Sequence, residues 1–276
     1  MTGLQTQADL FRAMHHGPKI LLLPNVWDVA SAKIIEQAGF GAVATTSAGI
    51  AFALGYPDGQ RISRDEMLTC VARIVKSVKV PVTADVEAGY GDRAEDTAQT
   101  AVGVIEAGAV GMNLEDGTDD AEHPLVDLAL QLEKLRAVRE AAASRHVPLV
   151  LNARTDVYLL PWAAGPVKRY DEALRRLSAF RDAGADCVFA PGLREPETIV
   201  RLVEDLRCPV NILAGPGSPS VPELQKLGVA RVSLGSAPMR ATLGLVKRMA
   251  EELKGAGTYR AMDGAPSHAD VNRMMG

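Results

Sequence analysis

Eight short apolar runs, separated by longer amphipathic stretches, are the feature that most limits how this chain can fold. The runs cover residues 20–23, 42–45, 80–85, 111–115, 147–152, 187–190, 210–213 and 231–234. Each is apolar almost throughout, as expected of parallel strands buried on both faces. The stretches between them have helical periodicity, and the predicted helices cover residues 30–38, 64–75, 96–107, 127–143, 170–183, 195–206, 220–227 and 240–253.

Several predicted helices end at a glycine that leads directly into the next strand, namely Gly39, Gly108, Gly184 and Gly228. Strict alternation of strand and helix in 276 residues predicts one closed (β/α)₈ TIM-type barrel, a fold that needs about 250 residues. An open, doubly wound sheet is the alternative. We expect a single domain over residues 1–276, with the barrel core at about 17–245. An extra helix at 4–15 precedes the core, and a helical tail at about 246–276 follows it.

Composition excludes several classes of function. The net charge is −4 and no basic stripe is present, so we expect no nucleic-acid partner. No apolar run approaches the roughly 20 residues of a membrane span. The N-terminus lacks the pattern of a signal peptide, which predicts a cytoplasmic protein. Three cysteines without paired spacing indicate neither a disulfide framework nor a zinc site.

Acidic residues gather at the ends of the predicted strands, where barrel enzymes carry their reacting groups. The third run ends with Asp85 and Glu87, which point the same way if the strand continues. The fourth run ends at Glu115, and Asp58 follows the second run. Acids on one face repel each other unless a cation or proton lies between them. Because only oxygen ligands are present, the sequence predicts Mg²⁺, or alternatively Mn²⁺, bound by Asp85, Glu87 and Glu115; the alternative is a solvated turn with surface acids.

Other polar residues at the strand ends are candidates for substrate binding. Arg154 closes the fifth run, where it could hold a substrate carboxylate in a bidentate grip or form a structural salt bridge. Thr46 and Ser47 follow the second run, and their backbone N–H groups could bind an anion or simply form a turn. Asn211 is the polar side chain of the seventh run, either a substrate contact or a satisfied structural amide.

Together these segments resemble the isocitrate lyase/phosphoenolpyruvate mutase superfamily, over roughly residues 17–245. The resemblance rests on the sequences PNVWD at 24–28, LGYPD at 54–58, DVEAGYG at 85–91, LED at 114–116 and AR at 153–154. The length matches the branch of small enzymes, which includes methylisocitrate lyases, phosphonomutases and the hydrolases of phosphonopyruvate and oxaloacetate. The resemblance implies a homotetramer in which the C-terminal helices are swapped between neighbouring subunits.

The resemblance also implies roles for individual residues. Asp85 would bind Mg²⁺ directly, Glu87 and Glu115 would bind it through water, and Asp58 would line the same site. Family members usually have Asp at the position of Glu87, so the metal geometry would differ slightly. Arg154 would contact the substrate.

The resemblance places the carboxylate of a 2-oxo acid at Thr46, Ser47 and Ala48, partly on backbone N–H groups. The segment at 116–124 departs from the superfamily pattern. Lyases have a mobile loop there with a Cys that acts as an acid, and mutases and hydrolases have a Lys, whereas this chain has neither. His123 is the candidate proton donor in this segment, because imidazole titrates near neutral pH.

These observations predict a Mg²⁺-dependent lyase that cleaves a C–C bond in a small 2-oxo or 2-hydroxy di- or tricarboxylic acid through a metal-stabilised enolate. The predicted catalytic residues are Arg154, Asp58, Glu115 and His123, and the predicted substrate contacts are Thr46, Ser47, Ala48, Asp85, Arg154 and Asn211. Decarboxylation or hydrolysis of oxaloacetate, and chemistry at a C–P bond, are alternatives within the superfamily. A 2-oxo-acid-binding protein with little turnover is another. The last alternative is an unrelated enzyme that binds phosphate at Gly215, Gly217 and Gly235.

Overall fold

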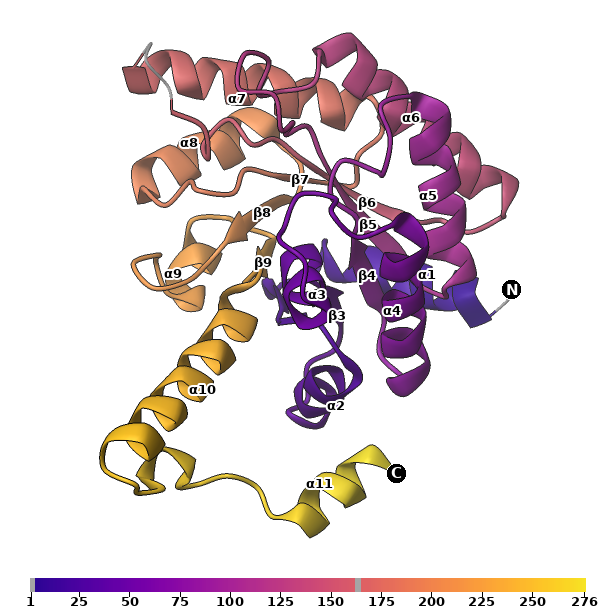
Figure 1. Ribbon diagram of the computed structural model, residues 1–276. Helices are drawn as coiled ribbons and strands as arrows, with labels where there is room; N and C mark the ends of the chain where they lie inside the picture. Colours follow the sequence, from indigo (N-terminus) through magenta and orange to yellow (C-terminus); the bar gives the residue numbers. More distant parts are fainter. Residues whose placement is uncertain (1–2, 162–164) are drawn as a thin grey trace.

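A parallel sheet closes on itself to form the body of the molecule. The computed structural model describes residues 3–161 and 165–276, and its strands lie in the order β1-β9-β8-β7-β6-β5-β4-β3-β2 (Figure 1). The strands are β1 (Leu21–Leu23), β2 (Asn25–Val26), β3 (Val43–Thr45), β4 (Val82–Asp85), β5 (Gly111–Glu115), β6 (Val150–Arg154), β7 (Cys187–Phe189), β8 (Val210–Leu213) and β9 (Arg231–Ser233). Each neighbouring pair is parallel, which confirms the predicted (β/α)₈ barrel.

The first strand of the barrel is interrupted at Pro24, a detail that the sequence interpretation did not include. Strand β1 pairs with β9 on one side of the closure, and β2 pairs with β3 on the other. Pro24 has no N–H to donate, but its carbonyl accepts a bond of 3.2 Å from the backbone N of Ala44. The two short strands therefore act as one barrel strand.

Most of the helices surround the sheet on its outer side (Figure 1). The helices of the chain are α1 (Gly3–Met14), α2 (Val29–Gln37), α3 (Ser47–Leu54), α4 (Arg64–Ser77), α5 (Ala94–Glu106), α6 (Leu128–Ser144), α7 (Gly165–Asp182), α8 (Pro196–Leu206), α9 (Val221–Lys226), α10 (Ala237–Gly255), the 3₁₀ turn η1 (Arg260–Met262) and α11 (His268–Met275). The four junction glycines have φ between 83° and 101°, the left-handed conformation that a helix-ending glycine adopts. The prediction that a glycine ends each of these helices is therefore confirmed.

Helix α1 packs close to the N-terminal end of β5. Phe11 is fully buried, and a Cβ added to Gly111 would lie 2.8 Å from its ring. The glycine at the start of β5 thus leaves room for the aromatic ring of the extra N-terminal helix. The opposite end of the barrel, where the strands finish, is left to the βα loops.

The C-terminal helices extend away from the barrel. Helix α10 projects from the body of the molecule, and the chain turns back so that α11 lies near α2 (Figure 1). Lys33 of α2 donates to the carbonyls of Met274 and Met275 at 3.1 and 2.7 Å. Within the part of the chain that the structure describes, no helix has both the length and the apolar character needed to span a membrane.

Candidate active site

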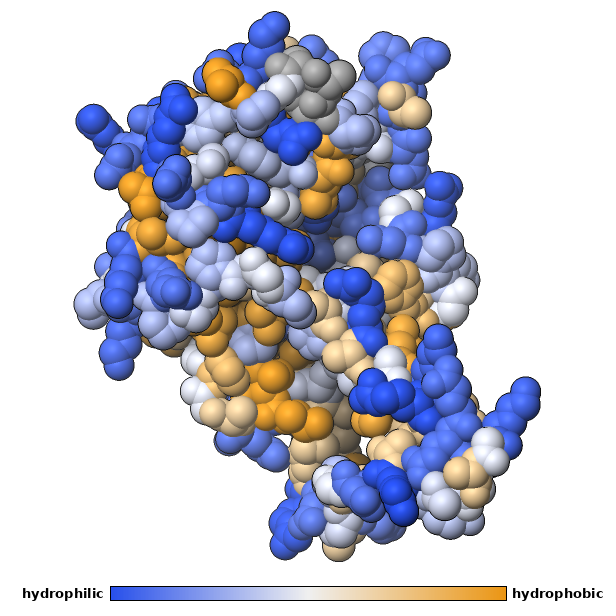
Figure 2. Space-filling view, turned by 90° about the vertical axis from the view of Figure 1, so that its left-hand side faces the viewer, coloured by the Kyte–Doolittle hydropathy of each residue, from blue (hydrophilic) through white to orange (hydrophobic). Residues whose placement is uncertain are grey.

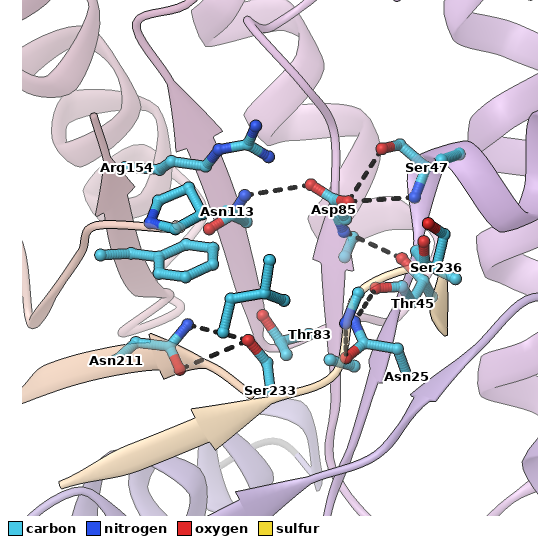
Figure 3. Close-up of a pocket in the computed structure, with 18 of the residues that line it drawn as sticks. Asn25, Thr45, Ser47, Thr83, Asp85, Asn113, Arg154, Asn211, Ser233 and Ser236 are labelled. Atoms are coloured by element: carbon cyan, nitrogen blue, oxygen red, sulfur yellow. Dashed lines mark hydrogen bonds between the residues drawn. The ribbon is translucent and has the colours of Figure 1, made fainter. Parts of the chain in front are cut away.

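A cavity of about 170 Å³ opens at the ends of the strands (Figure 3). Its lining comes from nearly every strand of the barrel: Asn25, Ala44, Thr45, Thr46, Ser47, Ala48, Asp58, Thr83, Ala84, Asp85, Asn113, Arg154, Leu159, Phe189, Pro191, Asn211, Leu213, Arg231, Ser233, Gly235 and Ser236. The cavity is smaller than the roughly 300–1,000 Å³ of pockets for drug-sized ligands. It suits a small acid better than a nucleotide.

Asp85, the last residue of β4, is the most strongly hydrogen-bonded acid of the pocket. Its Oδ2 accepts from the backbone N of Ser47 at 3.0 Å and from the Ser47 hydroxyl at 2.8 Å. Its Oδ1 accepts from the side-chain amide of Asn113 at 3.0 Å, and Asn113 in turn accepts from Asn152 at 2.7 Å. These donors hold the carboxylate of Asp85 in a fixed position in the pocket (Figure 3).

The donors at Ser47 belong to helix α3, which the sequence interpretation read as a loop or a turn. Thr46 is the N-cap, and its hydroxyl accepts from Gly49 N at 3.3 Å. Ser47 is the first residue of the helix, so its N–H lies at the positive end of the helix dipole. Helix N-termini bind anions well, and Thr46, Ser47 and Ala48 all line the pocket.

Glu87 lies outside the lining of the pocket. Strand β4 ends at Asp85, and Glu87 has a φ of 52°, so the strand alternation that was used to align the two side chains does not reach it. Its carboxylate accepts from Gln60 N at 2.5 Å and from the Tyr90 hydroxyl at 3.3 Å. Burial, together with the charge of Asp85, raises the pKa of Glu87 to about 7. The two acids therefore interact even though they bind different partners.

Glu115 and Arg154 form a partly buried ion pair between the ends of neighbouring strands. Arg154 Nη1 lies 2.5 Å from Glu115 Oε2. The Nε and Nη2 atoms of Arg154 donate to the two carboxylate oxygens of Asp156, at 2.5 and 2.9 Å. Burial raises the pKa of Glu115, and the guanidinium opposes that shift. Arg154 thus lines the pocket and forms the salt bridge that the sequence offered as an alternative to a substrate contact.

A second buried network holds Asp156 in place. Asp116 is fully buried and accepts from Asp156 N at 2.9 Å, from the Thr155 hydroxyl at 2.7 Å and from Arg176 Nη1 at 3.0 Å. A Cβ on Gly117 would lie only 2.5 Å from Asp156 Oδ2. No role for Asp116 was predicted from the sequence, because its partners lie directly after β6 and on α7, which are distant in the chain.

The remaining predicted residues divide into two groups. Asp58 lines the pocket, and burial is the main cause that raises its pKa. Asn211 also lines the pocket, where its amide donates to the Ser233 hydroxyl at 3.2 Å. His123 lies outside the pocket lining, on an exposed turn with its side chain 80% accessible and its Nδ1 3.1 Å from Asp120. The segment that carries His123 folds back on itself, because Gly117 and Leu125 at its two ends form an antiparallel bridge.

The glycine loops that suggested a phosphate site already use backbone N–H groups within the protein. Gly215 N donates to the Ser218 hydroxyl at 3.2 Å, and Gly235 N donates to the Asn25 side-chain oxygen at 2.8 Å. Asn25 also accepts from Leu234 N at 2.7 Å. These groups are therefore not free to bind an anion, which disfavours the phosphate alternative.

The acids around the pocket fit a divalent cation in chemistry, although their side chains have other partners in this structure. Among residues 3–161 and 165–276, no three or more His, Cys, Asp or Glu side chains are arranged to hold a metal ion. Asp85, Glu87 and Glu115 nevertheless lie at the ends of two adjacent strands, and the charge of Asp85 contributes to raising the pKa of both glutamates. A cation would relieve this repulsion.

Comparison with known proteins agrees with this geometry. The family model described as phosphoenolpyruvate phosphomutase matches residues 11–254. The chain belongs to this family. It is therefore a member of the isocitrate lyase/phosphoenolpyruvate mutase superfamily of enzymes, as the resemblance indicated.

Individual relatives cover most of the chain. An uncharacterised protein of Mycobacterium tuberculosis (strain H37Rv) is 36% identical over 233 residues, which are 84% of this chain and 84% of that protein. The 2-methylisocitrate lyase of Escherichia coli K12 is 26% identical and covers 94% of this chain and 88% of its own length. A solved Burkholderia cenocepacia J2315 structure, described as a lyase/mutase, has a TM-score of 0.90 and 39% identity over 98% of this chain and 95% of its own.

Proposed function

We propose that this protein is a Mg²⁺-dependent lyase that cleaves a C–C bond in a small 2-oxo or 2-hydroxy carboxylic acid. The observation that carries the proposal is the pair of donors from Ser47 at the N-terminus of α3, which already hold one carboxylate oxygen in the pocket. A substrate carboxylate could take the same donors, because Asp85 would turn toward a metal ion. The names of relatives support this class: they include 2-methylisocitrate lyases and oxaloacetate decarboxylases.

The metal in this proposal is Mg²⁺, with Mn²⁺ as a substitute. Asp85, Glu87 and Glu115 are the residues that would hold it, with Asp85 as the direct ligand. A solved phosphonopyruvate hydrolase with oxalate and Mg²⁺ has a TM-score of 0.84 and 25% identity, over 97% of this chain and 94% of its own. A bound divalent ion would supply Lewis-acid stabilisation of the negative charge that develops when the C–C bond breaks.

The protein's own residues would orient the substrate and move the proton. Arg154 is fixed by Asp156 and Glu115, so its position costs no reorganisation when a substrate carboxylate arrives. Asp58 lies at the pocket mouth, and its raised pKa suits a group that exchanges a proton. His123 would reach the substrate only if its turn moved toward the pocket.

Turnover with and without metal tests the proposal. Purified protein would be assayed with oxaloacetate, methylisocitrate and phosphonopyruvate, in Mg²⁺ and after removal of metal with EDTA. We expect metal-dependent release of a 2-oxo acid product from a substrate of the C–C class. If cleavage occurs only at phosphonopyruvate, the enzyme performs C–P chemistry. Mg²⁺-dependent binding without turnover would instead identify a 2-oxo-acid-binding protein, an alternative favoured by the exposed position of His123.

We also propose that the protein is a homotetramer of the cytoplasm, in which C-terminal helices are exchanged between subunits. Helix α10 buries little of itself in the monomer, and Leu243, Leu245, Val246 and Leu253 are exposed along it. Figure 2 shows apolar surface where this extension leaves the barrel. Sedimentation velocity would show about four times the 29.3 kDa mass of one chain. A variant ending at residue 236 would remain monomeric.

A further inference from the structure

The pocket extends below the strand ends, into the interior of the barrel. Thr83 lies two residues before Asp85 on β4, and Arg231 lies two residues before Ser233 on β9. All four line the pocket, and Figure 3 shows Thr83 below Asp85. Strand residues two apart share a face and lie about 7 Å apart along the strand, so the deeper residues form a second level of the pocket. We refer to Thr83, Arg231 and the neighbouring Asn211 as the pocket floor.

Arg231 brings a buried positive charge to the pocket floor. The residue is 2% exposed, and no acid in the described part of the chain forms an ion pair with it. Its Nε is buried without a hydrogen-bond partner. Burial lowers the pKa of Arg231, but a guanidinium remains charged in proteins. Removing an ion from water is costly unless a partner compensates its charge, so an anionic group at this position would be stabilised.

The neighbours of Arg231 do not supply that anionic group. Arg231 Nη1 lies 3.5 Å from His15 Nε2, and His15 Nδ1 lies 2.9 Å from the Phe11 carbonyl. Because a carbonyl only accepts, Nδ1 carries the proton and Nε2 is the acceptor of a neutral ring. Burial raises the pKa of Cys187 to about 12, which keeps this thiol neutral as well. Asp85 acts on Arg231 without pairing with it, and a metal ion at Asp85 would take up that charge.

Arg154, the other cation in the described part of the pocket lining, already has its charge compensated. Its guanidinium pairs with Glu115 and with Asp156. Arg154 can still contact a substrate, but its burial does not require one. Of the two cations, Arg231 is therefore the one whose charge a ligand would complete.

Thr83 adds a second unsatisfied group to the pocket floor. Its Oγ1 is buried without a hydrogen-bond partner, and a hydroxyl can donate to a carboxylate. Buried polar groups in proteins are nearly always hydrogen-bonded, so two such groups at one end of a pocket point to a polar ligand group. A water molecule would satisfy the hydrogen bonds, but it would leave the charge of Arg231 uncompensated.

We infer that the pocket floor binds a second carboxylate of the substrate, with Arg231 as its donor and counter-charge. The substrate is then a 2-oxo or 2-hydroxy dicarboxylic acid whose first carboxylate lies at the metal and at Ser47. The distance of about 7 Å between the two levels of the pocket suits a chain of four carbons. The inference rests on the proposed function and names the substrate class and a binding residue for it.

A matched pair of ligands tests this inference. Malate and its 4-amide have nearly the same shape, but only malate is charged at the distal group. Calorimetry in saturating Mg²⁺ would compare both with oxalate, which has no distal group. We expect the wild type to bind malate at least about tenfold more tightly than the amide, because a hydrogen bond between two charged groups is the stronger one. Equal or tighter binding of the amide would overturn the inference and leave the proposed function intact if oxalate binds. Absence of Mg²⁺-dependent oxalate binding would overturn both.

A pair of variants assigns the preference for malate to its residue. Arg231→Met removes the charge, and Arg194→Met is the matched control, because Arg194 is exposed and lies outside the pocket lining. We expect the preference to fall below about threefold in Arg231→Met and to persist in the control, with oxalate affinity within about threefold of the wild type in both. A residue with only a structural role would change all three affinities together. Arg231→Lys keeps a cation and should keep a preference above about threefold.

Two other results would contradict the inference. If Arg231→Met retains the full preference for malate, the distal carboxylate binds another cation, such as Arg154. The second result concerns a free anion, tested by replacing gluconate with chloride at constant ionic strength. If chloride raises the thermal midpoint of the wild type but not of Arg231→Met, and the wild type does not prefer malate, the pocket floor holds a free anion and not a substrate carboxylate.

Discussion

Ser47 donates two hydrogen bonds to one oxygen of Asp85, from its backbone N at 3.0 Å and from its hydroxyl at 2.8 Å. The carboxylate of a strand end thus occupies the anion site of a helix N-terminus. This relationship explains why Asp85 does not join Glu87 and Glu115 in this structure. The anion site and the proposed metal site share one residue, so arrival of a metal at Asp85 would free Ser47 for the substrate.

The first prediction concerns Asp85. Asp85→Asn keeps an oxygen that can accept from Ser47 but loses the bond from the Asn113 amide, so the thermal midpoint should fall slightly. The neutral amide is a poor Mg²⁺ ligand, and Mg²⁺-dependent oxalate binding should fall by more than about 100-fold, beyond the 10- to 100-fold typical of groups that only orient ligands. Calorimetric titration with Mg²⁺ and oxalate measures this. Unchanged affinity in a folded variant would exclude Asp85 as the direct ligand.

The second prediction concerns Gly117, whose missing side chain makes room for Asp156. In Gly117→Ala the new Cβ would lie 2.5 Å from Asp156 Oδ2 and would displace the carboxylate that fixes Arg154. We expect kcat/KM to fall by about 10- to 100-fold, because small displacements of a positioning group are costly. Gly215→Ala is the matched control, since no atom lies within 4 Å of its Cβ and neither glycine has a positive φ. Equal activities of the two variants would contradict the role of Asp156.

The order of strands and helices could be predicted from the sequence, and so could the residues at the strand ends that line the pocket. The strand ends were predictable because buried parallel strands are continuous apolar runs, and their last residues are the polar ones. Helix α3 was not expected, because its sequence is apolar nearly all round and gives no amphipathic period. The side chain of Glu87 was predicted to point the same way as that of Asp85, but the strand ends at Asp85. Glu87 itself has a left-handed backbone conformation, which a pattern of residue types does not reveal.

Contacts between distant segments were the part that no local pattern could give. Asp116 reads as one more acid at a strand end, yet it is buried against Arg176 from α7. Phe189 reads as one apolar residue of a buried strand, yet its side chain lines the pocket. Both roles depend on which strands become neighbours in the barrel, so they follow from the closed topology and not from spacing in the sequence.

The third prediction is a pH dependence of stability that arises at His15. His15 is 4% exposed; burial, and then the charge of Arg231, lower its pKa to about 3. Its Nδ1 bonds the Phe11 carbonyl at 2.9 Å while its Nε2 faces Arg231, so the folded state keeps the ring neutral. Below pH 6.5 His15 is protonated in the unfolded chain but stays neutral in the folded chain. The contribution of His15 is therefore complete above pH 6.5 and declines as the pH falls toward 3.

Urea unfolding at several pH values would measure this effect. The slope from one such group is about 1.4 kcal/mol per pH unit, so it should remove about 2 kcal/mol between pH 6.5 and 5. His15→Gln cannot titrate and should lose correspondingly less stability over the same range, whatever its stability at pH 7. Parallel pH profiles for the two proteins would show that His15 is not the titrating group.

The last prediction separates the two candidates for proton transfer. Asp58 lines the pocket mouth with a raised pKa, whereas the His123 side chain is 80% exposed and contacts Asp120. A group that moves the proton typically contributes 10²- to 10⁴-fold. Asp58→Asn should therefore lower kcat by about 100-fold or more, and His123→Gln should lower it by less than about threefold.

The opposite ranking would show that the turn at 116–124 closes over the substrate and brings His123 to the reacting atoms. A variant that releases the turn from its neighbouring loop distinguishes this case further. Arg61 donates to Asp119 at 3.0 Å and ties the turn to the loop that carries Asp58. If closure is needed, Arg61→Gln should change kcat as strongly as His123→Gln does. If Asp58 acts alone, Arg61→Gln should leave kcat within about threefold of the wild type, because this exposed ion pair contributes little to stability.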